Sequence, residues 1–233
     1  MNTKFTNALL AKRKSGAVPV VPDIKCRSPK EGDLLRGRDP VKFATLLKDA
    51  GAPALSVVTE AANFGGSTEL LRRVVSATSL PVLRKDFITC FEDLEVTKQC
   101  GADAVLLMCA VQSERLLFDL YHEALRIGLE PLVETHTKEE LLLARKLGAR
   151  FIGINNRNIL ELERDDGTVR STVELASLVP DEAVLISESS ISTPKDAYDA
   201  IEAGADAVLV GTAIWNADDA REFYLSLCKG RDD

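Results

Sequence analysis

The sequence lacks several features that would assign it to common functional classes. It has no excess of positive charge, because 36 acidic residues outnumber 29 basic ones and the net charge is −7. A protein that binds nucleic acid needs a basic face, so this balance argues against such a partner. No run approaches the roughly 20 apolar residues of a membrane span, and the first 14 residues lack the apolar core of a signal peptide. We therefore expect a cytoplasmic protein with neither a nucleic-acid nor a membrane partner.

Metal-binding patterns are also missing. The five cysteines are scattered, there are only two histidines, and no C-x-x-C or Cys/His cluster occurs. Zinc or another metal is therefore not expected, and the cysteines are interpreted as reduced thiols of a cytoplasmic protein. No linker or low-complexity tract divides the 233 residues, which predicts one domain.

Eight short apolar runs alternate with helical stretches along the chain. Each run is rich in Val, Ile and Leu and lacks polar alternation, which is typical of a strand buried on both faces. Capping signals open several helices, among them Asp39-Pro40 and a capping box at Thr137–Glu140. Strands joined by helices pair in parallel. The predicted strands are Val18–Val21, Ala54–Val58, Leu80–Leu83, Ala104–Met108, Leu129–Val133, Phe151–Ile154, Ala183–Ile186 and Ala207–Val210.

A closed barrel explains this alternation better than an open sheet does. Gly-Ala-Asp-Ala-Val-Leu occurs at Gly101 and again at Gly204, about half a barrel apart. No G-x-G-x-x-G follows the first run, as an open dinucleotide-binding sheet would require. We predict an α/β protein with a (β/α)8 TIM barrel as its single domain, in which residues 1–16 form a short N-terminal helical extension and 17–233 the barrel.

Polar residues follow most of the predicted strands. In a TIM barrel the carboxyl ends of the strands form the active-site mouth. Asp23 and Lys25 are two apart and so share one face of the first strand, and Lys85, Glu134 and Glu188 come at the ends of three others. A structural ion pair is the less favoured alternative for Asp23 and Lys25, whereas Lys85, Glu134 or Glu188 alone is most simply a paired or solvated residue. Together they predict a mixed acid and base cage with shifted pKa values.

The last two loops carry small residues that suit a phosphate. Ser189 and Ser190 follow the seventh run, and Gly211 and Thr212 follow the eighth. Backbone N–H groups and hydroxyls at these two loops bind phosphate in many TIM barrels. Ordinary turn chemistry is the simpler alternative, but the barrel context favours phosphate.

These residues form motifs that resemble the indole-3-glycerol phosphate synthase family. The resemblance runs in order from Phe5 to Leu227 and covers six strands. The motifs are Asp23-Ile-Lys-x-x-Ser-Pro, Leu55-Ser-Val-Val-Thr-Glu, Phe64-Gly-Gly-Ser, Leu83-Arg-Lys-Asp-Phe-Ile, Glu130-Pro-Leu-Val-Glu, Gly153-Ile-Asn-x-Arg and Glu188-Ser.

The resemblance implies a carboxy-lyase of tryptophan biosynthesis that needs no cofactor. Its substrate would be 1-(2-carboxyphenylamino)-1-deoxyribulose 5-phosphate, and its products indole-3-glycerol phosphate, CO2 and water. Other enzymes of the pathway are candidate partners. Lys25 would contact the substrate carboxylate and polarise the ketone, Lys85 would be the general acid, and Glu134 the base for dehydration. The remaining implied site residues are Asp23, Asn155 and Glu188 around the reacting groups, Ser28, Phe64 and Arg157 around the anthranilate, and Ser189, Ser190, Gly211 and Thr212 at the phosphate.

Two departures from the family pattern leave alternatives open. The first-strand acid is usually Glu and here is Asp23, and the usual Glu-Ser-Gly is here Glu188-Ser-Ser190. If that glycine position has a positive φ, Ser190 is strained there. One alternative is a paralogue that acts on a related aryl-amino sugar phosphate in secondary metabolism. Another is a non-catalytic barrel that binds a phosphorylated ligand, although a pure binder needs no paired acid and base.

Overall fold

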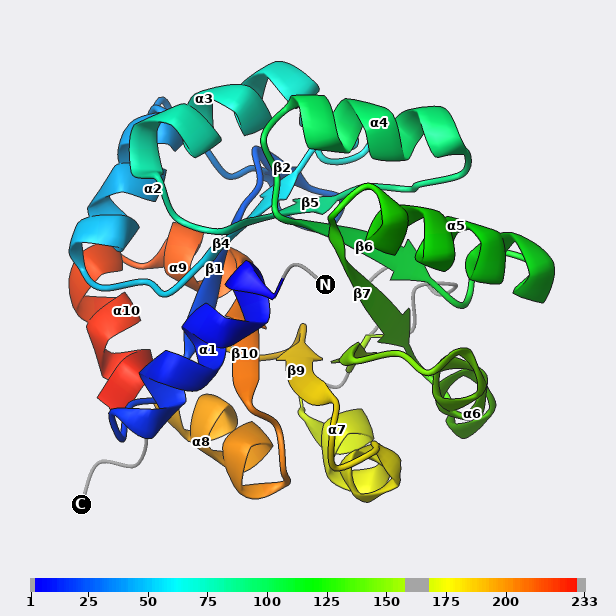
Figure 1. The fold of residues 1–233 in the computed structure, drawn as a ribbon. Helices are drawn as coiled ribbons and strands as arrows, with labels where there is room; N and C mark the ends of the chain where they lie inside the picture. Colours follow the sequence, from blue (N-terminus) through cyan, green and yellow to red (C-terminus); the bar gives the residue numbers. More distant parts are fainter. Residues whose placement is uncertain (1–2, 158–167, 230–233) are drawn as a thin grey trace.

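Eight parallel strands close into a barrel, as predicted. The structure, a computed structural model, describes residues 3–157 and 168–229. Within these residues the strand order around the barrel is β1-β10-β9-β8-β7-β6-β5-β4, and β2 and β3 form a small antiparallel sheet. Helices surround the barrel as an outer ring (Figure 1). The barrel strands are β1 (Val20–Ile24), β4 (Leu55–Val58), β5 (Val82–Lys85), β6 (Ala104–Met108), β7 (Glu130–Thr135), β8 (Phe151–Asn155), β9 (Val184–Glu188) and β10 (Ala207–Val210).

The helices lie between the strands where the sequence predicted them. Asp39 caps α2 and accepts hydrogen bonds from the N–H groups of Val41 and Lys42, with Pro40 in the first turn. The short strands and helices are β2 (Arg27–Ser28), β3 (Gly32–Asp33), α1 (Lys4–Lys14), α2 (Pro40–Asp49), α3 (Thr68–Thr78), α4 (Phe91–Gln99), α5 (Glu114–Arg126), α6 (Lys138–Leu147), α7 (Arg170–Leu175), the 3-10 turn η2 (Ala176–Leu178), α8 (Pro194–Glu202), α9 (Thr212–Asn216) and α10 (Ala220–Lys229). No helix in the described part of the chain is both long and apolar enough to cross a membrane.

The capping box predicted at Thr137 is only half formed. The Thr137 side chain accepts a hydrogen bond from the N–H of Glu140, as predicted. The Glu140 carboxylate instead accepts from the N–H of His136, one residue before the cap. The prediction of a reciprocal box was therefore wrong, because Glu140 also contacts the His136 ring and is drawn toward it.

Several strands extend further than the apolar runs predicted. Lys85 pairs with Val58 in the barrel ladder, and Glu188 pairs with Asn155 and Leu209. Hydrophobicity marks a strand only while its side chains are apolar, so the predicted bounds stopped before the polar last residues. Lys85, Asn155 and Glu188 are thus the final residues of β5, β8 and β9, and their backbone is fixed by the sheet.

The N-terminal helix α1 crosses the opposite end of the barrel (Figure 1). Its Phe5 and Leu9 are fully buried against the apolar side chains of the barrel interior, and Phe5 lies 5.6 Å from the Phe151 ring. The Glu130 carboxylate accepts from the N–H groups of Phe5 and Thr6 at 2.5 and 3.1 Å. The extension thus closes the amino-terminal end of the barrel. Of the predicted domain, residues 1–2, 158–167 and 230–233 lie outside the described ranges.

Candidate active site

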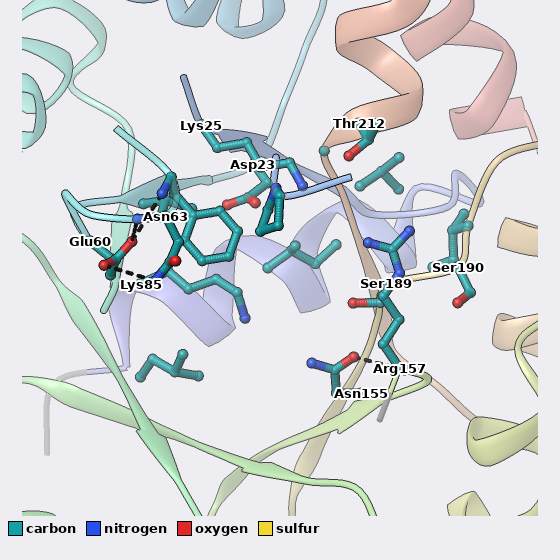
Figure 2. A pocket seen from close by; sticks show the side chains of 18 of the residues that line it. Asp23, Lys25, Glu60, Asn63, Lys85, Asn155, Arg157, Ser189, Ser190 and Thr212 are labelled. Carbon is teal, nitrogen blue, oxygen red and sulfur yellow. Dashed lines mark hydrogen bonds between the residues drawn. The ribbon is translucent and has the colours of Figure 1, made fainter. Parts of the chain in front are cut away.

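A cavity of about 420 Å³ opens at the carboxyl ends of the barrel strands. Figure 2 shows polar side chains from several strands and loops pointing into it. Eleven of the thirteen predicted site residues line it, namely Asp23, Lys25, Phe64, Lys85, Glu134, Asn155, Arg157, Ser189, Ser190, Gly211 and Thr212. The prediction from strand ends therefore located the cavity.

Lys85 is partly exposed to the cavity and contacts two fully buried carboxylates, with which it forms a charge cluster. Its Nζ donates to Glu134 Oε2 at 2.9 Å and to Glu188 Oε2 at 2.7 Å. Burial alone would lower the pKa of Lys85, but the two carboxylates outweigh burial and raise it. Glu188 is not among the lining residues and lies behind this ammonium group. Burial raises the pKa of Glu188 to about 7, although Lys85 opposes the shift. The cluster therefore holds a fixed cation and a carboxyl group that titrates near neutral pH.

Gly153 makes room for this cluster. It pairs with Glu134 in the sheet, and a Cβ at this position would lie 2.2 Å from Glu188 Oε1. Such a distance is a severe overlap, so only glycine leaves the Glu188 carboxylate where Lys85 contacts it. The glycine of the Gly153-Ile-Asn-x-Arg motif is thus explained by side-chain space in the site.

Asp23 and Lys25 come from β1 and its carboxyl end, and both are buried. Ser56 on the neighbouring strand donates a 2.7 Å hydrogen bond to Asp23 Oδ1, and Trp215 Nε1 donates to the Asp23 carbonyl at 3.0 Å. A Cβ on Gly211 would lie 3.1 Å from Asp23 Cβ and from Lys25 Cε. Asp23, which is one methylene shorter than the Glu usual in the family, is therefore held firmly against the loop after β10.

The loop after β9 has an unusual backbone. Ser189 and Ser190 have φ of +66° and +59°, a region that disfavours residues with a Cβ. The Asn156 amide supports the loop by donating to the carbonyls of Glu188 and Ser189, at 2.9 and 3.3 Å. Ser190 therefore occupies a left-handed conformation at the position where the family commonly has glycine, and the expected strain is present.

The loop after β4 places Phe64 at the cavity. The Glu60 carboxylate accepts hydrogen bonds from the N–H groups of Asn63 and Phe64, at 2.8 and 3.0 Å. Gly66 is required behind it, since a Cβ there would lie 2.2 Å from the Val58 carbonyl oxygen. Glu60 follows the end of β4 and lines the cavity, but it was not predicted as a site residue. Its position just after a strand, at the start of a loop whose N–H groups it can accept from, was the signal that could have identified it.

Other residues of the cavity were missed or placed differently. Phe87, Met108 and Ile191 line the cavity but are apolar, so no chemical motif marks them. Ser28 is 2% exposed and does not line the cavity. Its predicted place beside the substrate carboxylate stays a prediction. Asn155 Oδ1 accepts from the N–H of Arg157 at 3.0 Å and so fixes the start of the Arg157 loop.

Comparison with known proteins agrees with these motifs. The sequence model of "Indole-3-glycerol phosphate synthase" matches residues 1–227. The chain belongs to this family. It is 45% identical over 210 residues to the indole-3-glycerol phosphate synthase of Pyrococcus furiosus, which covers 90% of this chain and 91% of that protein. The Pyrococcus abyssi synthase is 43% identical over 91% of this chain and 92% of its own length.

Membership in the indole-3-glycerol phosphate synthase family confirms the predicted enzyme class, a carboxy-lyase of tryptophan biosynthesis. The structure of an N-acetylmannosamine-6-phosphate 2-epimerase from Clostridium perfringens superposes with a TM-score of 0.66. It covers 84% of this chain and 86% of that chain at 17% sequence identity. At this identity the likeness supports the fold alone.

Proposed function

We propose that the cavity binds 1-(2-carboxyphenylamino)-1-deoxyribulose 5-phosphate and converts it to indole-3-glycerol phosphate. The observation that carries the proposal is the Lys85 ammonium, which bridges Glu134 and Glu188 at the base of the cavity. An acid and a base in contact suit a reaction that protonates one oxygen and removes a proton elsewhere. The family membership makes this reaction the one to test first.

The substrate carboxylate would lie among the cations of the cavity. Lys25 and Arg157 both line it, and Lys25 is 7% exposed. A cation in such a dry site interacts strongly with an anion. Phe64 supplies an apolar surface for the aromatic ring. Lys25 would also polarise the ketone, which makes its carbon a better electrophile for the ring carbon that carries the carboxylate.

Lys85 would act as the general acid in this scheme. When the ring carbon bonds to the ketone carbon, the ketone oxygen takes a proton from Lys85, which regains one from solvent, and the carboxylate leaves as CO2. Lys85 would then protonate the departing hydroxyl during dehydration, while Glu134 accepts the proton from the neighbouring nitrogen or carbon. Asp23, Asn155 and Glu188 would orient the groups around these two.

The phosphate would bind at the loops after β9 and β10. Ser189, Ser190, Gly211 and Thr212 all line the cavity, and Figure 2 shows Ser189, Ser190 and Thr212 on one side of it. Their hydroxyl and backbone N–H groups are the donors that a phosphate requires.

An indole-fluorescence assay with the proposed substrate tests this assignment. Lys85→Ala and Glu134→Gln should each lower kcat by about 10²–10⁴-fold, the range for a general acid or base. Lys98→Ala is the matched control, because Lys98 is exposed and its Nζ contacts the Gly128 carbonyl on the helical ring. Wild-type turnover in both Lys85→Ala and Glu134→Gln would refute the roles.

A cytoplasmic location and association with other enzymes of tryptophan biosynthesis complete the proposal. The reason for both is the pathway itself, whose intermediates pass between enzymes. Fractionation of cells that express a tagged chain, followed by affinity capture, tests both points. A tagged protein found outside the cytoplasmic fraction, or captured without any pathway enzyme, would refute the corresponding part.

A further inference from the structure

His136 stands directly behind the proposed base. It follows β7, and its ring is 9% exposed. Its Nε2 lies 3.5 Å from Glu134 Oε1, and its Nδ1 lies 3.2 Å from Glu140 Oε2 on α6. The ring thus connects the carboxylate at the cavity with a carboxylate near the surface of the helical ring. None of the sequence motifs singled it out.

Glu140 fixes which nitrogen of the ring carries a proton. Its Oε2 accepts the backbone N–H of His136 at 2.7 Å, so this carboxylate is already used as an acceptor. An ionised carboxylate can only accept hydrogen bonds. The Nδ1 atom beside it therefore carries a proton, and the state of the ring is decided at Nε2.

Nε2 and Glu134 Oε1 are both buried and lie 3.5 Å apart. Among the residues that the structure describes, neither atom has a hydrogen-bond partner. If both carried only lone pairs, two buried acceptors would face each other without compensation, which is costly. A proton between Nε2 and Oε1 removes that cost, and it resides either on the ring or on the carboxyl group.

The second oxygen of Glu134 indicates where this proton resides. Oε2 accepts from the Lys85 ammonium at 2.9 Å, and a cation at that distance favours the ionised carboxylate. We propose that His136, oriented by Glu140, is a positioning residue that carries its second proton and holds Glu134 ionised and ready to accept a proton. The inference rests on the proposed role of Glu134 as the base.

The charges around His136 support this assignment. Burial would lower the pKa of His136, but Glu140, Glu134 and Glu188 outweigh burial and raise it. Burial would likewise raise the pKa of Glu134, but Lys85 and His136 lower it. Further groups face this cluster: Asp23 acts on Lys85 and Glu188, and Cys109 is kept neutral because burial, Glu140 and Glu134 raise its pKa to about 12. The positive end of the helix dipole at the N-terminus of α6 disfavours a charged His136 ring. The attraction of Glu134, Glu140 and Glu188 for the charged ring must therefore be larger than this repulsion.

Titration of the histidine rings tests the charge directly. The chain has two histidines, and His122 is exposed, so NMR of ¹³Cε1-labelled protein gives two signals that His122→Gln assigns. We expect His136 to titrate above the ordinary histidine value of about 6.5 and its midpoint to shift downward in Glu134→Gln. A His136 midpoint at or below about 6.5, unchanged in Glu134→Gln, would overturn the proposal. This readout needs no turnover, so it remains informative even if Glu134→Gln proves active and the proposed base role fails.

The pH profile of kcat/KM provides the functional test. His136→Gln keeps an N–H donor but removes the charge, so its acidic limb should move to higher pH by at least about 1 unit. Glu140→Gln should move the limb in the same direction by less, and His122→Gln should not move it. A limb that stays at the wild-type position in both His136→Gln and Glu140→Gln would overturn the proposal. If His136→Gln fails to fold by circular dichroism, the wild-type titration and Glu140→Gln decide.

Discussion

Gly153→Ala should slow the enzyme without unfolding it. The new Cβ would lie 2.2 Å from Glu188 Oε1, and ordinary contacts begin near 3.4 Å. The carboxylate must therefore retreat by about 1 Å, and a misplacement of this size costs about 10²-fold in rate. Glu188 is fully buried and its other oxygen contacts Lys85 Nζ at 2.7 Å, so the retreat disturbs the proposed acid as well. We expect kcat to fall by about 10²-fold, or about 2.7 kcal/mol of transition-state stabilisation.

The backbone is not the cause of this expected effect. Gly153 is a strand residue and does not have a positive φ, so alanine is compatible with its conformation. Gly148→Ala is the matched control, because Gly148 has a φ of +73° and a Cβ added there would have no heavy atom within 4 Å. Gly148→Ala should lower stability by about 1–2 kcal/mol and keep kcat. The fluorescence assay and urea unfolding separate the two effects. Wild-type kcat in Gly153→Ala would refute the reasoning.

Four further substitutions test the backbone strain, the titration of Glu188 and the closed end of the barrel. Ser190→Gly and Ser79→Gly each relieve a positive φ and should add about 0.5–1 kcal/mol in urea unfolding, but only Ser190→Gly should change KM. Because burial raises the pKa of Glu188 from 4.5 to about 7, the folded state holds a proton there that the unfolded chain releases, so stability falls as pH rises through this window. Glu188→Gln should remove that fall in stability, measured by urea unfolding at pH values across the same window. Glu130→Gln weakens three hydrogen bonds to α1 and should cost about 1–3 kcal/mol by thermal unfolding, whereas an unchanged melting temperature would contradict the role of the carboxylate.

The sequence predicted that polar residues lie at the strand ends, but alternation did not determine which of two adjacent cations faces inward. Arg84 and Lys85 are adjacent, so one had to face the barrel interior, and alternation alone could not choose between them. Arg84 donates instead to the Asp93 carbonyl and to Thr97 Oγ1 on α4, at 2.9 Å each, which leaves Lys85 inward. The choice depends on acceptors that α4 offers, and these are known only once the helix is placed.

The sequence could not predict how His136 and Ser28 lie relative to the cavity. No motif assigns His136 a role, and the sequence alone leaves open whether it lies at the surface or behind the site. Its ring is buried between Glu134 and Glu140. Ser28 is buried and does not itself line the cavity, and its place beside the substrate stays a prediction. Both depend on how a loop turns after its strand, and loop direction follows from long-range contacts such as the 3.0 Å hydrogen bond from the Arg27 N–H to the Phe64 carbonyl.

The barrel interior explains why so few charges can be so strongly coupled. Below the level of Lys85, the strands contribute an apolar layer that includes Leu83, Leu106 and Leu132, and α1 closes the far end with Phe5. The charges of the cluster therefore lie over an apolar floor, where charge interactions are stronger than in bulk water. The barrel thus does more than place the catalytic groups. Its apolar floor strengthens the effect of Lys85, which lowers the pKa of Glu134 and acts against the rise in the pKa of Glu188.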